Sequence, residues 1–222
     1  MATQSVTQPG ATTQAYPFFE RALEWTKTHP QITSWTVAAV LVGVGLFIWT
    51  SSSTRRSEAI AGRQLQAARY AFDNQNLPLA ASELARITEN YSGTNAASEG
   101  RLLLAQVRLL QGQSQQAVDM LREFAPRASA AFRSQAYGLL GAAYENLSKP
   151  KEAAEAYQAG AEGARMDFLK AQMLSDAGRA WAAAGDTVKA IAAYRRILND
   201  LPKEVAVTEA RVRLGELTKG TP

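Results

Sequence analysis

Few residues in this chain of 222 carry side chains suited to bond-making chemistry. Cysteine is absent, which excludes thiolate zinc sites, iron–sulfur clusters, disulfides and cysteine nucleophiles. The one histidine, His29, precedes an apolar segment instead of lying within a cleft-forming domain, so a Ser-His-Asp triad is not expected. Composition therefore disfavours most enzyme classes, and we expect a protein that is not an enzyme and has no catalytic residue, no metal site and no cofactor.

Paired acidic residues are the remaining candidates for acid–base chemistry. Glu152 and Glu155 are three residues apart on a predicted helix, and Lys149 and Lys151 lie near them. This pattern is typical of a solvated helix face. No glycine-rich phosphate loop accompanies it.

The net charge is +4, with both signs interspersed along the chain. A nucleic-acid partner is therefore not expected, because it usually requires a clustered basic face.

The elements that would position functional groups start with a polar tail. Residues 1–15 are rich in Thr, Gln, Ser and Ala, and we expect them to be disordered. In residues 16–30, Pro17 suits a first helical turn, and apolar residues follow it at helical spacing. This segment is predicted to be an amphipathic helix in the membrane interface, with Trp25 at the level of the lipid headgroups. The alternative is a helix that packs on its own protein.

An uncharged apolar run follows over residues 32–49. Its 18 residues would span roughly 27 Å as a helix, close to the thickness of a bilayer core. Trp35 and Trp49 bracket the run, as interfacial aromatic residues do. A buried core helix and a cleavable signal peptide are the alternatives, but a preceding region of ~30 residues and the lack of an Ala-x-Ala directly after the run disfavour the latter. We predict a single transmembrane helix over residues 31–53.

The charges that flank this run bear on its orientation. Arg55, Arg56 and Arg63 follow it, whereas the basic residues before it are fewer. The positive-inside rule therefore mildly favours a cytoplasmic C-terminal side.

Internal repetition predicts the fold of the remaining chain. One unit reads Tyr137-x-x-Leu140-Gly141-x-x-Tyr144, followed by Ala153 and Tyr157. It resembles the tetratricopeptide repeat (TPR) in residue types and spacing. A small residue recurs at intervals of 37, 36 and 37, at Ala80, Ala117, Ala153 and Ala190. The prediction is an all-α, TPR-like solenoid with four helix pairs over 54–202, then a capping helix and tail over 203–222.

A TPR array binds partners, and the first helix of each pair should supply its inner face. The repeat register places seven residues of mixed polarity there, which suits a protein or peptide segment. It lacks the clustered Lys and Asn residues that would clamp a terminal carboxylate. The candidate partner-binding residues are Arg69, Phe72, Gln106, Leu109, Gln135, Glu145 and Arg179.

The layout resembles the YfgM-like family of single-pass, membrane-anchored TPR proteins. The resemblance is carried by Phe18-Phe19-Glu20, by the Gly-interrupted run Val40-Leu41-Val42-Gly43-Val44-Gly45 and by the array with its cap. It implies a protein of the bacterial inner membrane whose TPR domain lies in the periplasm. The implied role is an accessory one at the protein-translocation channel, beside periplasmic chaperones, and it includes no catalytic residues.

Two functions remain open at this stage. One is a chaperone-like adaptor at the translocon, held to membrane lipid by its anchor. The other is a permanent structural or assembly subunit of another large hetero-oligomeric membrane complex, respiratory or photosynthetic. The two differ in stoichiometry, since only a permanent subunit should co-purify at a fixed ratio.

Overall fold

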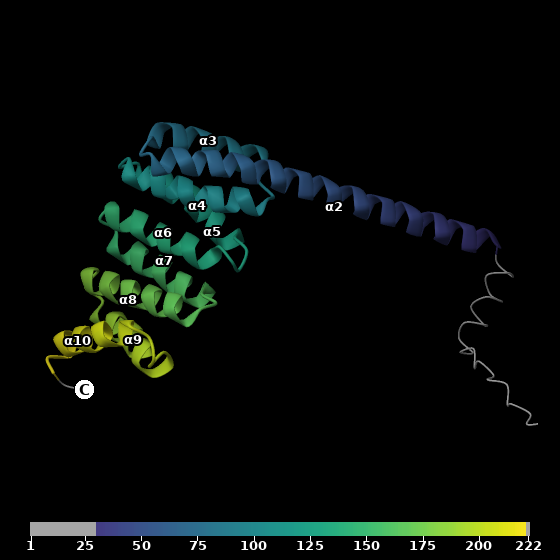
Figure 1. The fold of residues 1–222 in the computed structure, drawn as a ribbon. Helices are drawn as coiled ribbons and strands as arrows, with labels where there is room; N and C mark the ends of the chain where they lie inside the picture. The colour runs from purple at the N-terminus through teal and green to yellow at the C-terminus, as the bar shows by residue number, and fades with distance from the viewer. Residues whose placement is uncertain (1–29, 221–222) are drawn as a thin grey trace, which may run out of the picture. The chain divides into compact units, whose positions relative to one another are not determined.

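The computed structural model describes the backbone of residues 30–220 and the side chains of residues 35, 40–44 and 53–220. All regular structure in these residues is helical (Figure 1). The helices are α2 (Pro30–Asp73), α3 (Leu77–Asn90), α4 (Asn95–Leu110), α5 (Ser114–Arg127), α6 (Arg133–Asn146), α7 (Pro150–Gly163), α8 (Asp167–Ala183), α9 (Thr187–Asp200) and α10 (Ala206–Thr218).

The chain divides into two compact units, Met1–Ser53 and Thr54–Pro222. In the first unit, the predicted tail, residues 16–29 of the predicted interfacial helix and the side chain of Trp49 lie outside the described residues. Trp25 is among these residues, and Pro30, the predicted end of the interfacial helix, is the first residue of α2. Trp35 is described, and its side chain is 77% exposed. Among the described residues, no helix has both the length and the apolar character needed to cross a membrane.

The second unit contains the predicted repeat. Helices α3, α5, α7 and α9 each have 14 residues and begin at 77, 114, 150 and 187, which are intervals of 37, 36 and 37. The four alanines that revealed the period all have 0% exposure. The prediction of an all-α, TPR-like solenoid is therefore confirmed.

The turns within successive pairs repeat with the same period. Each contains one residue with positive φ, at Gln75 (59°), Gly112 (74°), Ser148 (56°) and Gly185 (81°). The next residue donates its backbone N–H to a carbonyl in the last turn of the preceding helix, as Lys149 does to Tyr144 at 2.9 Å. The left-handed residue reverses the chain, so each second helix begins at the same place relative to the first.

Two glycines set the distance between helices of a pair. A Cβ at Gly141 would lie 2.6 Å from the ring of Tyr157, and a Cβ at Gly178 would lie 2.7 Å from the ring of Tyr194. Both tyrosines are at least 96% buried. The rings therefore occupy space that only a glycine leaves free.

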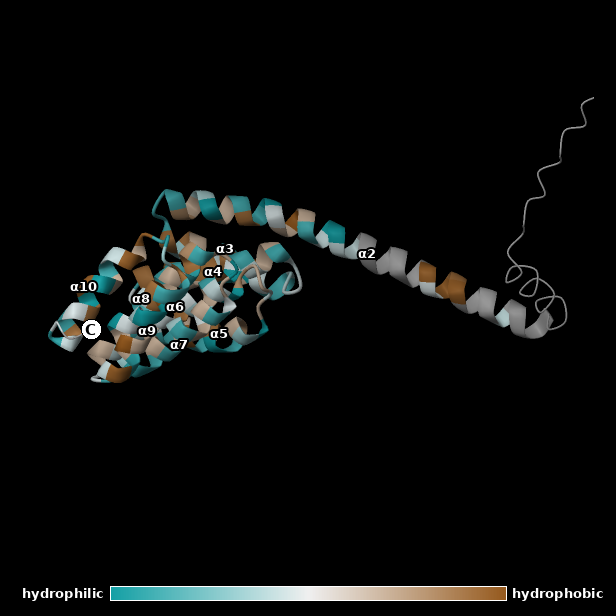
Figure 2. Ribbon diagram, turned by 90° about the horizontal axis from the view of Figure 1, so that it is seen from below, coloured by the Kyte–Doolittle hydropathy of each residue, from teal (hydrophilic) through white to brown (hydrophobic). Residues whose placement is uncertain are grey.

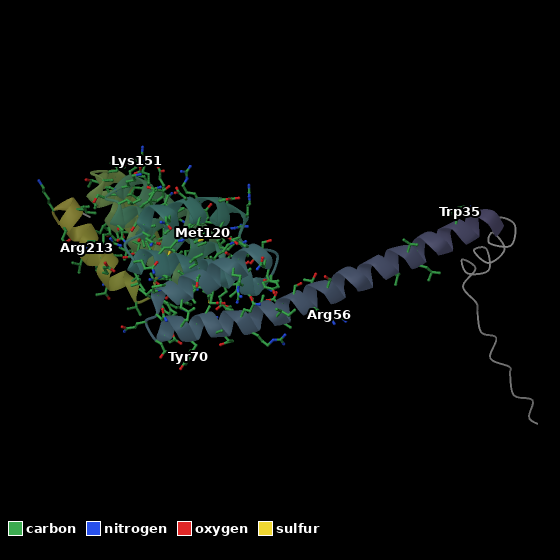
Figure 3. The ribbon with its side chains drawn as sticks, turned by 90° about the horizontal axis from the view of Figure 1, so that it is seen from above. Trp35, Arg56, Tyr70, Met120, Lys151 and Arg213 are labelled. Carbon is green, nitrogen blue, oxygen red and sulfur yellow. The ribbon has the colours of Figure 1, made fainter. Side chains whose placement is uncertain are left out.

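The core is continuous from pair to pair. Met120 packs against the cluster around α3 and α4 and also against the cluster around α5 and α6. Tyr144 packs against the cluster around α5 and α6 and also against the cluster around α8 and α9. Figure 3 shows Met120 within the array and Lys151 and Arg213 at its outside, and Figure 2 shows hydrophobic and hydrophilic residues on each of its helices. Each pair is thus stabilised by its neighbours.

One carboxylate joins the first helix of the array to the next pair. Glu58 of α2 accepts hydrogen bonds from the backbone N–H groups of Asn95 and Ala96, both at 2.9 Å. These donors lie in the first turn of α4, where N–H groups lack partners within the helix. Thr94 caps the same helix by accepting from the Ala97 N–H at 3.0 Å.

Candidate functional site: a groove across three helices

The first and second helices of the pairs differ in whether they contact the equivalent helix of the next pair. The first helices of successive pairs contact one another, α4 with α6, α6 with α8 and α8 with α10. The described second helices α3, α5, α7 and α9 make no such contacts among themselves. The array therefore curves, with α4, α6, α8 and α10 on its concave side.

A groove of about 380 Å³ lies on this concave side. It crosses α4, α6 and α8, and Tyr157 of α7 also contributes to its lining. Its lining residues are Leu102, Gln106, Gln135, Gly138, Leu139, Ala142, Tyr157, Leu169, Gln172, Met173 and Asp176.

The lining combines an apolar floor with exposed amides. Each of the three helices contributes one exposed glutamine, Gln106 from α4, Gln135 from α6 and Gln172 from α8. An amide both donates and accepts hydrogen bonds, so these side chains can pair with the main chain of a ligand.

Charged residues meet at one end of the groove. Arg179 donates to both oxygens of Glu145 and, through Nη2, to Asp176 Oδ1 at 2.8 Å. Glu145 Oε2 also accepts from the Tyr157 hydroxyl at 2.9 Å. This charged cluster of Glu145, Tyr157, Asp176 and Arg179 ties α6, α7 and α8 together. It also fixes the position of Asp176 in the lining.

The protonation equilibria of this cluster are shifted by burial. Burial raises the pKa of Asp176, and the charges of Glu145 and Glu209 add to the shift, while Arg179 opposes it. Burial and the hydrogen bond to Glu145 raise the pKa of Tyr157. For Arg179, burial acts to lower the pKa, but the two carboxylates outweigh it and the net shift is upward. The guanidinium therefore stays charged.

The predicted partner-binding residues have different environments. Gln106 and Gln135 line the groove. Glu145 and Arg179 belong to the charged cluster beside it. The remaining three are engaged within the array. Arg69 forms an ion pair with Glu99, while Phe72 and Leu109 are partly buried against the core.

Sequence reasoning missed most of the groove floor. Leu139, Leu169 and Met173 were not singled out, although each lies three or four residues from a lining residue on the same helix. That spacing places residues on one helix face. It could have extended the predicted face from Gln135 along α6 and revealed its counterpart on α8.

A second cavity, of about 340 Å³, lies beside α4 and α5 around Arg101. The Arg101 guanidinium donates to the carbonyl oxygens of Thr88 and Ser92 and lies 5.3 Å from the centre of the Phe124 ring. Its donors hold the array together, so we assign this cavity a structural role.

A curved stack of helix pairs with a groove on its concave side defines an α-solenoid. The chain belongs to the tetratricopeptide repeat-like domain family, whose model matches residues 52–175. Repeats of this type typically mediate protein–protein interaction.

Solved structures share the fold at low sequence identity. The crystal structure of MamA protein has 19% identity and a TM-score of 0.56, over 72% of this chain and 81% of that one. A crystal structure of a Podosopora anserina putative kinesin light chain with nearly identical TPR-like repeats has 17% identity and a TM-score of 0.55, over 71% and 85%. The search of curated proteins returned no match.

Proposed function

We propose that this protein is a membrane-anchored scaffold that binds a protein partner in the groove across α4, α6 and α8. The groove is the observation that carries the proposal, because it presents apolar surface and unpaired amide groups on the concave side of the array. The proposed function is binding and not catalysis, since the chain has no cysteine and a single histidine.

The proposed anchor is the helix over 31–53. Its support is the uncharged sequence of residues 32–49 and the exposure of the apolar side chains that are described there. Val40, Leu41, Val42 and Val44 are 48–66% exposed. Contiguous exposed apolar surface needs a cover, and lipid is the cover that a run of this length fits.

The resemblance to YfgM-like proteins supports a particular setting for this scaffold. In that setting the protein is a single-pass protein of the bacterial inner membrane, with its TPR domain in the periplasm and an adaptor role at the translocon. The alternative is a permanent subunit of another membrane complex, respiratory or photosynthetic.

Purification of the tagged full chain in mild detergent, followed by mass spectrometry, tests the binding function. We expect one co-purifying protein that is lost in the double variant Gln135→Arg/Gln172→Arg, because two cationic side chains then occupy the groove. Val188→Arg is the control, since Val188 is 79% exposed and does not line the groove. Equal recovery of the partner by all three chains would contradict groove binding.

The same purification separates the two settings. An adaptor should be recovered with a partner at a ratio that falls as washing is prolonged, whereas a permanent subunit should keep a fixed ratio. Carbonate extraction tests the anchor, and we expect the chain to stay with the membrane pellet. Protease added to the periplasmic side should digest the array, and full protection there would overturn the proposed orientation.

A further inference from the structure

We infer that the groove binds an extended segment of its partner that carries a lysine or arginine at the α8 end. This inference rests on the proposed function, because it uses the same groove. It adds the conformation and the charge of the occupant.

The three glutamines indicate an extended main chain. Gln106, Gln135 and Gln172 are exposed, and each comes from a different helix of the concave side. Packed helices lie 8–10 Å apart, so the path across the groove from α4 to α8 covers about 20 Å, the length of about six extended residues. An extended strand leaves its N–H and C=O groups free for amides along this length, whereas a helix has already paired them.

The floor of the groove suits apolar side chains. Leu102, Leu139, Leu169 and Met173 line the same groove as the glutamines. Side chains of an extended segment alternate between its two faces, so one face can reach this floor while the other points to solvent. Met173 can adapt to apolar groups of different shape, since its thioether side chain is flexible.

The α8 end of the groove has an excess of negative charge. Asp176 lines the groove, and both Asp176 and Glu145 pair with Arg179. Glu209 of α10 accepts a hydrogen bond at 3.0 Å from Ser175, which precedes Asp176 on α8. Arg213 of α10 interacts with Glu209 through its charge and forms an ion pair with Glu216. With Glu216 counted, four carboxylates against two guanidiniums leave a charge of −2.

The carboxylates repel one another. The charges of Glu145 and Glu209 both act to raise the pKa of Asp176, beyond the larger effect of burial. A cationic side chain placed beside Asp176 would relieve this repulsion. Among the described residues that line the groove, none is a lysine or an arginine. The groove therefore offers no cation to an acidic segment or to a terminal carboxylate.

Fluorescence polarisation with the full chain in detergent micelles tests the inference. The probes are three fluorescein-labelled ten-residue peptides of one leucine-, alanine- and serine-containing sequence, which carry two lysines, two glutamines or two glutamates at the same positions. We expect the lysine peptide to bind about tenfold more tightly than the glutamate peptide, with the glutamine peptide between them. The preference should shrink as salt is raised, because salt screens exposed charges.

Two variants connect the preference to the α8 end. Asp176→Asn and Glu209→Gln keep the side-chain shapes and remove charge, so each should reduce the preference for lysine to about threefold or less. The affinity of the glutamine peptide should not change. Glu155→Gln is the control, because Glu155 is exposed on α7 and does not line the groove. Circular dichroism and thermal melting report whether each variant is folded.

Three results would overturn the inference. They are equal or tighter binding of the glutamate peptide, a lysine preference unchanged in both variants, and no binding of any peptide at millimolar concentration. Failure of the proposed function looks different, because the purified partner would then be retained by Gln135→Arg/Gln172→Arg. A partner lost in that double variant, without a lysine preference, would leave groove binding intact and remove only the inference on charge.

Discussion

Single glycines and tyrosines determine how closely the helices of the array approach. The Tyr194 ring lies where a side chain at Gly178 would be, and Tyr157 has the same relation to Gly141. Any larger residue must displace a buried aromatic ring from a close-packed position. Substitutions at these glycines should therefore cost stability although alanine is the better helix former.

Gly178→Ala should lower the free energy of unfolding by about 1–3 kcal/mol, because overpacking outweighs the gain in helix propensity. Chemical denaturation of the full chain in detergent measures the change. Gly62→Ala is the matched control, since a Cβ at Gly62 meets no atom within 4 Å. It should be neutral or stabilising by up to about 1 kcal/mol. A destabilisation of equal size at both sites would refute the packing argument.

Tyr157→Phe should cost about 1 kcal/mol near neutral pH, because Glu145 loses a hydrogen-bond donor. The phenol has a raised pKa in the folded chain and an ordinary pKa of about 10 when unfolded. Its neutral form therefore contributes stability that is fully present below pH ~10 and is lost as the pH rises further. The variant should lose less stability than the wild type in this alkaline range.

Denaturation midpoints measured between pH 8 and 11.5 check this prediction. Tyr70→Phe serves as the control, because Tyr70 is 73% exposed. Identical alkaline slopes for the wild type and Tyr157→Phe would show that Tyr157 ionises normally.

Turns with a left-handed residue join the helices of each pair. Glycine occupies this position at Gly112 and Gly185, but glutamine and serine occupy it at Gln75 and Ser148. A non-glycine residue in this region costs about 1–2 kcal/mol. Two of the four turns are therefore strained relative to the glycine-containing ones.

Ser148→Gly should raise the free energy of unfolding by about 1 kcal/mol, since the φ of 56° then carries no Cβ penalty. Gly185→Ala is the reciprocal variant and should destabilise by about 1–2 kcal/mol. Urea denaturation measures both changes. Loss of stability in Ser148→Gly would mean that the serine side chain contributes more than its backbone strain costs.

Glu58→Ala should lower the free energy of unfolding by about 1–2 kcal/mol, because two N–H groups at the start of α4 lose their acceptor. Glu89→Ala, at an exposed position of α3, should change stability by less than about 0.5 kcal/mol. Amide hydrogen exchange offers a local check, since Asn95 and Ala96 should exchange faster in Glu58→Ala alone.

The helix pairs could be predicted from the sequence because small residues recur in it at the spacing of the repeat. Only alanine or glycine fits where two helices approach closely. The equivalent position in each second helix is therefore occupied by a buried alanine, at Ala80, Ala117, Ala153 and Ala190. The turns at Gln75 and Ser148 were less predictable, because neither residue favours positive φ by itself. The cap from Glu58 could not be predicted either, since it joins residues 37 and 38 positions apart.

The curved array as a whole creates the groove, which no single repeat contains. Gln106 and Gln135 were predicted from the repeat register, and the structure places them in one groove. Arg69 and Phe72 follow the same register but lie in the first pair, where an ion pair and the core engage them. Register therefore predicts which helix face is concave, whereas the depth of the groove depends on side chains from neighbouring repeats.

Disulfide or maleimide crosslinking from single introduced cysteines tests groove binding most directly, because the natural chain has none. Gln135→Cys and Gln172→Cys place the thiol in the groove, and Glu155→Cys places it on α7 away from the lining. In native membranes we predict that both groove positions crosslink to the same protein and that position 155 does not. Crosslinking of that protein from position 155 alone, or from no groove position, would contradict the account.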